Sequence, residues 1–125
     1  MFRVLNDATA QSDWPQERHL EFVQKCEVYI KGLQTRNQLV GAQPLARQGV
    51  IVSRSGAGWT EQPLQSTGEI QVGYYVIRAP NLGEAVQIAK ANPEFEYGTS
   101  ARVEVRPLTD EEDISGYAYP KLHSA

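Results

Sequence analysis

Charged residues alternate with valines near the end of the chain, between Arg102 and Arg106. Because successive side chains of a strand point to opposite faces, Arg102, Glu104 and Arg106 should share one face, and Val103 and Val105 the other. An arginine fork suits a carboxylate or a phosphate group, so this row is a candidate site for an anionic ligand. The alternative is a network of charge pairs at an interface between two subunits.

Four further residues could take part in chemistry, and each has a structural alternative. Cys26 would be a nucleophile if a base or cation lowered its pKa, but its place among apolar residues also fits a core. Glu61 would be a general acid or base if burial raised its pKa, or else an exposed residue of a turn. Tyr74 and Tyr75 must point to opposite faces of their strand, so one belongs to the core and the other faces a cavity or an interface.

Composition restricts the classes of function. The chain has 125 residues, a net charge of −3 and one cysteine. The length fits one domain, predicted over 1–109 with a tail over 110–125. The charge argues against binding of nucleic acid or an anionic membrane, and no cluster of residues has metal-ligand spacing. No apolar run is long enough for a membrane span, there is no leader pattern, and a single cysteine cannot form an internal disulfide, so we expect a cytoplasmic protein. We also expect no metal and no cofactor.

Local patterns predict the elements that position these residues. Apolar residues recur every three or four positions from Leu20 to Leu33, which predicts a helix that begins at a cap on Asp13. Asn81 opens a capping box that predicts a second helix, and Asn92-Pro93 marks its end. Strands are expected over 2–5, 38–45, 49–54, 59–64, 69–79 and 101–108.

This order of elements predicts an α+β fold of the ferredoxin-like type, a split βαβ arrangement with an antiparallel sheet. Two helices can cover only one face of such a sheet, which leaves a bare face on the order of 300 Å². We expect a second copy of the chain to cover it, giving a homodimer through the helix-free face that closes into an α/β barrel. Because unpaired charges are costly to bury, the row 102–106 would line a partly hydrated interior.

Residues 73–108 resemble the end of the YCII-related family, which is also called the DGPF family. The matching features are Gly73-Tyr74-Tyr75, Gly83-Glu84-Ala85, Asn92-Pro93 and the strand Val103-Glu104-Val105-Arg106-Pro107. A looser similarity extends the resemblance to about residue 18. It implies a ferredoxin-like subunit that forms a dimeric α/β barrel.

The resemblance also bears on the candidate site. The Asp-Gly-Pro-Phe stretch of the family corresponds here to Glu61-Gln62-Pro63-Leu64, which makes Glu61 the acid–base candidate. Many relatives carry a histidine on the first helix, proposed to act with an acid in a cleft, and Cys26 stands at that position. Glu61, one of the tyrosines at 74–75 and the row 102–106 would line such a cleft between the sheet and the first helix.

Two functions follow as expectations. The first is a dimeric small-molecule-binding protein with weak acid–base activity and a small anionic or aromatic ligand; whether it is an enzyme stays open. The second is a non-catalytic regulatory module linked to transcription, because members of the family resemble partners of extracytoplasmic-function sigma factors.

Overall fold

A four-stranded antiparallel sheet forms the centre of the structure. The computed structural model describes residues 1–120, and its sheet has the strand order β2-β5-β1-β6. Each neighbouring pair is antiparallel. This order and direction are those of a ferredoxin-like sheet, so the predicted α+β class is confirmed. The strands of the sheet are β1 (Phe2–Asp7), β2 (Leu39–Pro44), β5 (Glu69–Ile77) and β6 (Arg102–Val105).

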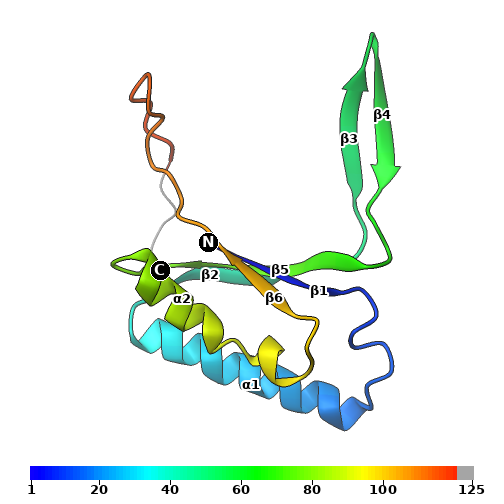
Figure 1. The fold of residues 1–125 in the computed structure, drawn as a ribbon, viewed down its shortest axis with the longest axis vertical. Coiled ribbons are helices and arrows are strands. Elements are labelled where there is room, and N and C mark those ends of the chain that lie inside the picture. Colours follow the sequence, from blue (N-terminus) through cyan, green and yellow to red (C-terminus); the bar gives the residue numbers. More distant parts are fainter. Residues whose placement is uncertain (121–125) are drawn as a thin grey trace.

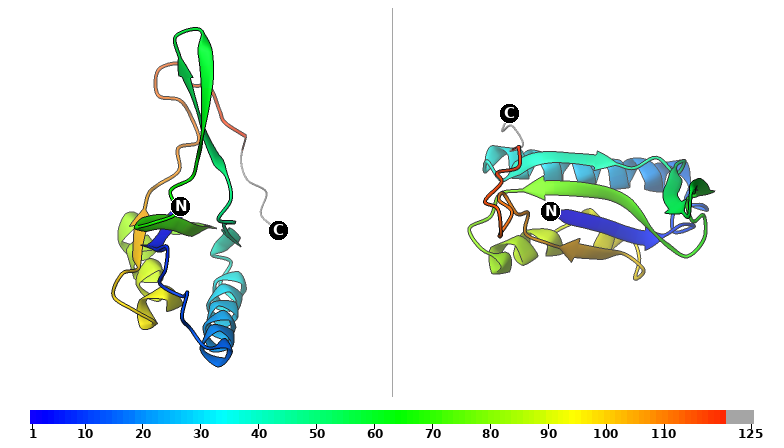
Figure 2. Two further views of the ribbon diagram at one scale, coloured as in Figure 1. Left: turned by 90° about the vertical axis from the view of Figure 1, so that its right-hand side faces the viewer. Right: turned by 90° about the horizontal axis from the view of Figure 1, so that it is seen from above.

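Both helices pack against one face of the sheet, as Figure 1 and the left view of Figure 2 show. They are α1 (Gln16–Thr35) and α2 (Leu82–Lys90), and a short 3₁₀ helix, η1 (Pro93–Glu96), follows α2. The predicted start of α2 is confirmed, because the side chain of Asn81 accepts a hydrogen bond from the backbone N–H of Glu84 at 2.8 Å.

The first helix differs from its predicted pattern in two respects. The predicted cap on Asp13 is wrong: the chain is still extended at Pro15, whose carbonyl accepts the first helical hydrogen bonds. The predicted inward position of Leu20 is also wrong, because its side chain is 51% exposed, whereas Phe22 and Leu33 are buried. In a helix of 3.6 residues per turn, Leu20 lies about 140° around the axis from Leu33, so it is on the side away from the buried residues.

The hydrophobic core lies between the sheet and the two helices. Phe2 of β1 and Leu33 of α1 are fully buried at its centre, and Tyr75 of β5 packs beside them. Val103 and Val105 contact this core from β6, as their alternation predicts. The last strand therefore turns its apolar side to the helices and its charged side away from them.

The opposite face of the sheet is not covered by a helix within residues 1–120, and we call it the open face. Arg102 and Glu104 lie on this face, and their charges are paired within the chain. The guanidinium of Arg102 donates to both carboxylate oxygens of Glu69, each at 2.6 Å. Arg3 contacts Glu104 at 2.5 Å, and Arg106 lies 3.6 Å from the same carboxylate.

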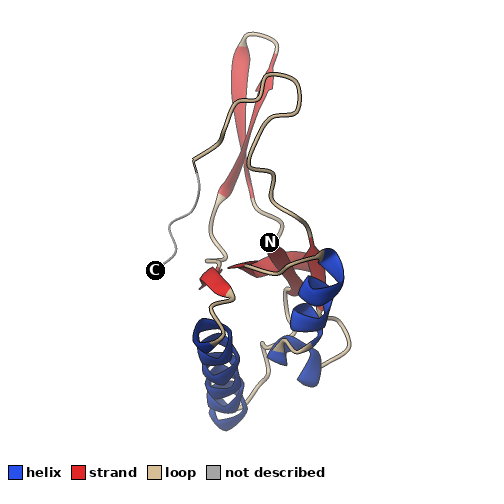
Figure 3. Ribbon diagram, turned by 90° about the vertical axis from the view of Figure 1, so that its left-hand side faces the viewer, coloured by secondary structure: helices blue, strands red, loops and turns tan. Residues whose placement is uncertain are grey.

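A hairpin between β2 and β5 projects away from the sheet on the side of the open face (Figures 1 and 3). Its strands are β3 (Val50–Ser55) and β4 (Gly58–Pro63), which within the described chain pair only with each other. Every residue of both strands is exposed. The segment that follows β6 rises on the same side (Figure 1), so the open face lies between this segment and the hairpin.

The predicted tail is described only in part, because residues 121–125 lie outside the described structure. In the part of the chain that is described, no helix is both long enough and apolar enough to cross a membrane.

Candidate functional site

A cavity of about 260 Å³ lies between α1 and the sheet, and we call it the helix cavity. It is smaller than the roughly 300–1,000 Å³ of sites for drug-sized ligands, so it suits a compact molecule. The turn after α2 closes one side of it. Its apolar wall is formed mainly by Val4, Phe22, Val23, Ile30, Ala42 and Val72.

Asn92 brings a buried amide to this cavity from the turn between α2 and η1. Its Oδ1 accepts a hydrogen bond from the backbone N–H of Glu94 at 2.9 Å, which fixes the orientation of the amide. The amide nitrogen, Nδ2, has no hydrogen-bond partner among the described residues, although Asn92 is only 2% exposed. A buried donor without a partner costs about 1–3 kcal/mol. Because the nitrogen has almost no accessible surface, an acceptor on a ligand would reach it after a shift of the Asn92 side chain.

Glu94 also lines the helix cavity and is half-buried. Asn6 donates from Nδ2 to Oε2 of Glu94 at 3.0 Å, and the Oδ1 of Asn6 accepts from the Ser100 hydroxyl at 2.6 Å. Burial raises the pKa of the Glu94 carboxyl above its ordinary value of 4.5, while the bond from Asn6 and the charge of Arg47 lower it. Because burial has the larger effect, Glu94 releases its proton closer to neutral pH than an exposed glutamate does.

Cys26 and Tyr75 also line the cavity. Burial raises the pKa of the Cys26 thiol to about 11, and the negative charge of Glu94 contributes to the increase. Burial is also the main cause that raises the pKa of the Tyr75 phenol. Both groups are therefore protonated at neutral pH, and Cys26 is not an activated nucleophile. No cluster of three or more possible metal ligands occurs among residues 1–120.

Two aromatic residues, Trp14 before α1 and Tyr97 after η1, hold Phe22 in the wall of the cavity. The ring centroid of Phe22 lies 5.6 Å from that of Trp14 and 5.3 Å from that of Tyr97. The guanidinium of Arg18 stacks on both outer rings, 4.8 Å from Trp14 and 4.9 Å from Tyr97. Since Arg18 also donates to the backbone carbonyl of Tyr97, these contacts tie the start of α1 to the segment after η1.

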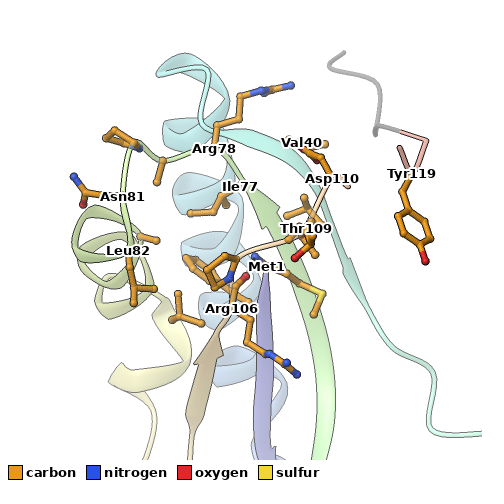
Figure 4. A pocket seen from close by; sticks show the side chains of 18 of the residues that line it. Met1, Val40, Ile77, Arg78, Asn81, Leu82, Arg106, Thr109, Asp110 and Tyr119 are labelled. Carbon is orange, nitrogen blue, oxygen red and sulfur yellow. Dashed lines mark hydrogen bonds between the residues drawn. The ribbon is translucent and has the colours of Figure 1, made fainter. Parts of the chain in front are cut away.

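A second hollow, of about 780 Å³, lies between α2, the ends of β5 and β6 and the segment that follows β6 (Figure 4). Arg78 and Arg106 border it, but Figure 4 shows that their side chains point in opposite directions. Two guanidinium groups arranged in this way do not form a joint fork on one anion. The helix cavity, which is lined by the buried Asn92 and the half-buried Cys26 and Glu94, is therefore the candidate functional site.

The sequence profile of the YCII-related domain matches residues 4–109, which is most of the chain. The chain belongs to the YCII-related family. The resemblance that residues 73–108 carry is therefore confirmed. A comparison with curated proteins found no match.

In this YCII-related chain, the residues that were expected to line one cleft are spread over different parts of the fold. Cys26, Tyr74 and Tyr75 border the helix cavity, although the register partners of Tyr74 place it in a row with residues of the open face. The row 102–106 lies on the open face itself. Glu61 lies in the middle of the exposed strand β4, opposite Val52, and does not line the helix cavity.

Sequence reasoning did not identify the two residues of this YCII-related chain that bring buried polar groups to the cavity, Asn92 and Glu94. The pair Asn92-Pro93 is typical of the end of a helix, and that is how it was interpreted. The same pair is also a start signal, because asparagine is a good N-cap and proline is favoured at the first helical position. The acidic residue directly after the pair, Glu94, is also typical of the first turn of a helix. This was the signal from which the short helix η1 could have been predicted.

Proposed function

We propose that the chain binds a small neutral molecule in the helix cavity. The observation that carries this proposal is the buried amide nitrogen of Asn92, which has no partner within residues 1–120 and belongs to a residue that lines an apolar cavity. An acceptor oxygen on a ligand would satisfy this donor, and an apolar body would fill the space between α1 and the sheet.

The charges around the helix cavity favour a neutral ligand over an anion. In the described chain, the residues that line the cavity include no arginine, lysine or histidine, whereas Glu94 is acidic. An anion would meet this carboxylate where no lining residue supplies a counter-charge, because Arg47, which acts on Glu94 electrostatically, does not line the cavity; this is costly in a partly buried site. The arginines of the row 102–106 lie on the open face, beside Glu69 and Glu104. A compact ketone, aldehyde, ester or amide, aliphatic or aromatic, fits the cavity better.

Thermal-shift measurements test this proposal. We expect neutral carbonyl compounds such as cyclohexanone to raise the melting temperature, and carboxylates of similar size such as benzoate not to raise it. At roughly 100 times the Kd, a ligand should stabilise the fold by about 2.7 kcal/mol. Val23→Phe should abolish the effect, because Val23 lines the cavity and a phenyl ring there would fill it.

Val28→Phe is the matched control for this experiment. Val28 lies on the same helix, is 71% exposed and does not line the helix cavity, so its variant should respond to ligand as the wild type does. If no neutral compound stabilises the wild type, or if the shift survives in Val23→Phe, the helix cavity is not the binding site.

We also propose that two copies of the chain pair through the open face. The dimeric barrel implied by the family resemblance supports this, as does the hairpin, where Val52 and Trp59 are 58% and 68% exposed. A two-stranded hairpin is only marginally stable by itself, so it gains from cover by another chain. The charges of the open face balance, which allows two identical faces to meet. They are Arg3, Arg102 and Arg106 against Asp7, Glu69 and Glu104.

Sedimentation velocity tests the homodimer. We expect the wild type to sediment with twice the mass of the chain, and Val52→Lys to raise the dissociation constant about 10-fold or more, because a charge would enter an apolar contact. Val28→Lys places the same charge on the exposed side of α1 and should leave the dimer intact. A wild-type protein with the mass of one chain at micromolar concentration would contradict the proposal.

A further inference from the structure

We infer that Glu94 removes a proton from the carbon next to the carbonyl group of the bound molecule, while the amide of Asn92 holds the carbonyl oxygen. This inference rests on the proposed function, because it takes a neutral carbonyl compound in the helix cavity as its starting point. It assigns the substrate class as ketones or aldehydes that carry a hydrogen on that carbon.

Glu94 and Asn92 are placed to act on a single ligand. The two residues are joined by the hydrogen bond from the N–H of Glu94 to Oδ1 of Asn92, and both line the helix cavity. Asn6 occupies one carboxylate oxygen, Oε2, while Oε1 has no hydrogen-bond partner in the described part of the chain. The cavity is thus lined by Glu94, which has a carboxylate oxygen without a partner, and by Asn92, which has a buried donor without a partner.

The electrostatic environment is consistent with a base at this position. Burial, opposed by Asn6 and Arg47, raises the pKa of the Glu94 carboxyl above its ordinary value, which strengthens it as a proton acceptor. The negative charge of Glu94 contributes to the raised pKa values of Cys26 and Tyr75, so these groups lie within its electrostatic reach. Because the Tyr75 phenol keeps its proton, it is a second donor at the cavity.

The proposed step is balanced without any other reactant. The Glu94 carboxylate takes the proton, the electron pair of the broken C–H bond forms the carbon–carbon double bond, and the carbonyl π pair moves to the oxygen. The amide of Asn92 stabilises the resulting enolate oxygen by hydrogen bonding. The proton on the Glu94 carboxyl exchanges with water, and return of a proton from this carboxyl to the carbon then restores the carbonyl compound. The net reaction is an exchange of these hydrogens with water.

Hydrogen–deuterium exchange measures this reaction directly. Cyclohexanone is incubated with the full chain in D₂O, and the loss of its α-proton signal is followed by NMR. We expect the wild type to accelerate exchange over buffer alone, and Glu94→Gln to lower the enzymatic rate about 100-fold. Asn92→Ser retains a side-chain oxygen to cap η1 but loses the amide donor, and it should lower the rate about 10-fold. The wild-type rate should rise with pH as Glu94 ionises, and this rise should be absent from Glu94→Gln.

Glu84→Gln is the matched control, because Glu84 is an exposed glutamate on α2 outside the cavity, and its variant should exchange at the wild-type rate. An absence of acceleration by the wild type, or an unchanged rate in Glu94→Gln, overturns the inference. The thermal shift with cyclohexanone separates the two proposals. A shift without exchange leaves the binding function standing and removes the chemistry, whereas the absence of both a shift and exchange removes both.

Discussion

Leu33→Ala should lower the free energy of unfolding by about 3 kcal/mol, within the range of roughly 2–5 kcal/mol for leucine in a protein core. Leu33 is 0% exposed and packs in one cluster with Phe2, Val4, Tyr75 and Ala89, which come from three other elements. Truncation would remove contacts with all of them and leave a void that a helix anchored at both ends cannot collapse. Since domains of this size are stable by only about 5–15 kcal/mol, the melting temperature should fall by roughly 10 °C.

Leu20→Ala provides the comparison, because it makes the same truncation on the same helix at a side chain that is 51% exposed. It should cost less than about 1 kcal/mol. Both variants are to be unfolded with urea at one protein concentration, since a dimer would link stability to concentration. Equal losses of unfolding free energy in the two variants would contradict the assignment of Leu33 to the buried side of α1 and of Leu20 to its exposed side.

The difference between Leu20 and Leu33 also shows how far sequence patterns reach. Both leucines belong to a run of apolar residues spaced by three or four positions, and the sequence predicts an inward position for both. The prediction is correct for Leu33, which is surrounded by the other residues of the core. It fails for Leu20 because the spacing to Leu33 puts the two side chains about 140° apart around the helix axis, and only the side of Phe22 and Leu33 is buried.

The alternation in β6 could be predicted in full because it depends on a strand period of two residues and on nothing distant. The ion-pair partner of Arg102 could not be predicted from that period. Its partner, Glu69, lies on β5, two strands away in the sheet order, and the pair forms only when β1 lies between them. A charge row that looks like an anion site in the sequence is in the fold largely occupied by carboxylates of the same chain.

The candidate site also depends on contacts between distant parts of the chain, which local sequence patterns do not predict. The sequence predicts a cleft between the first helix and the sheet, and the helix cavity lies there with Cys26 and Tyr75 on its wall. The acid expected in that cleft, Glu61, is on a hairpin that projects away from the sheet, and no local pattern indicates the direction in which a hairpin projects. Glu94 enters instead, because the short helix η1 lies beside α1 directly after α2.

Asn6→Ala is the second substitution for which we expect a large effect, a loss of about 3 kcal/mol at pH 7. Asn6 is 7% exposed, donates to the Glu94 carboxylate at 3.0 Å and accepts from the hydroxyl of Ser100 at 2.6 Å. A hydrogen bond to a charged group contributes about 1.5–3 kcal/mol, and its removal leaves the half-buried carboxylate without that donor. The Ser100 hydroxyl loses its acceptor in the same variant.

This loss should depend on pH in a direction that the structure fixes. The folded-state pKa of Glu94 is raised, so the contribution of this group to stability is fully present below the ordinary value of 4.5 and is lost as pH rises through the folded-state pKa. The bond from Asn6 limits that rise, so Asn6→Ala should raise the folded-state pKa further and lose additional stability over the same range. Urea unfolding at pH 4.5, 5.5 and 7 should therefore show a deficit that grows with pH.

In a Glu94→Gln background the deficit should be smaller and independent of pH, because no charge remains at this position. A deficit of constant size in the chain that retains Glu94 would mean that Asn6 supports the fold through Ser100 and the backbone, and not through the carboxylate of the helix cavity.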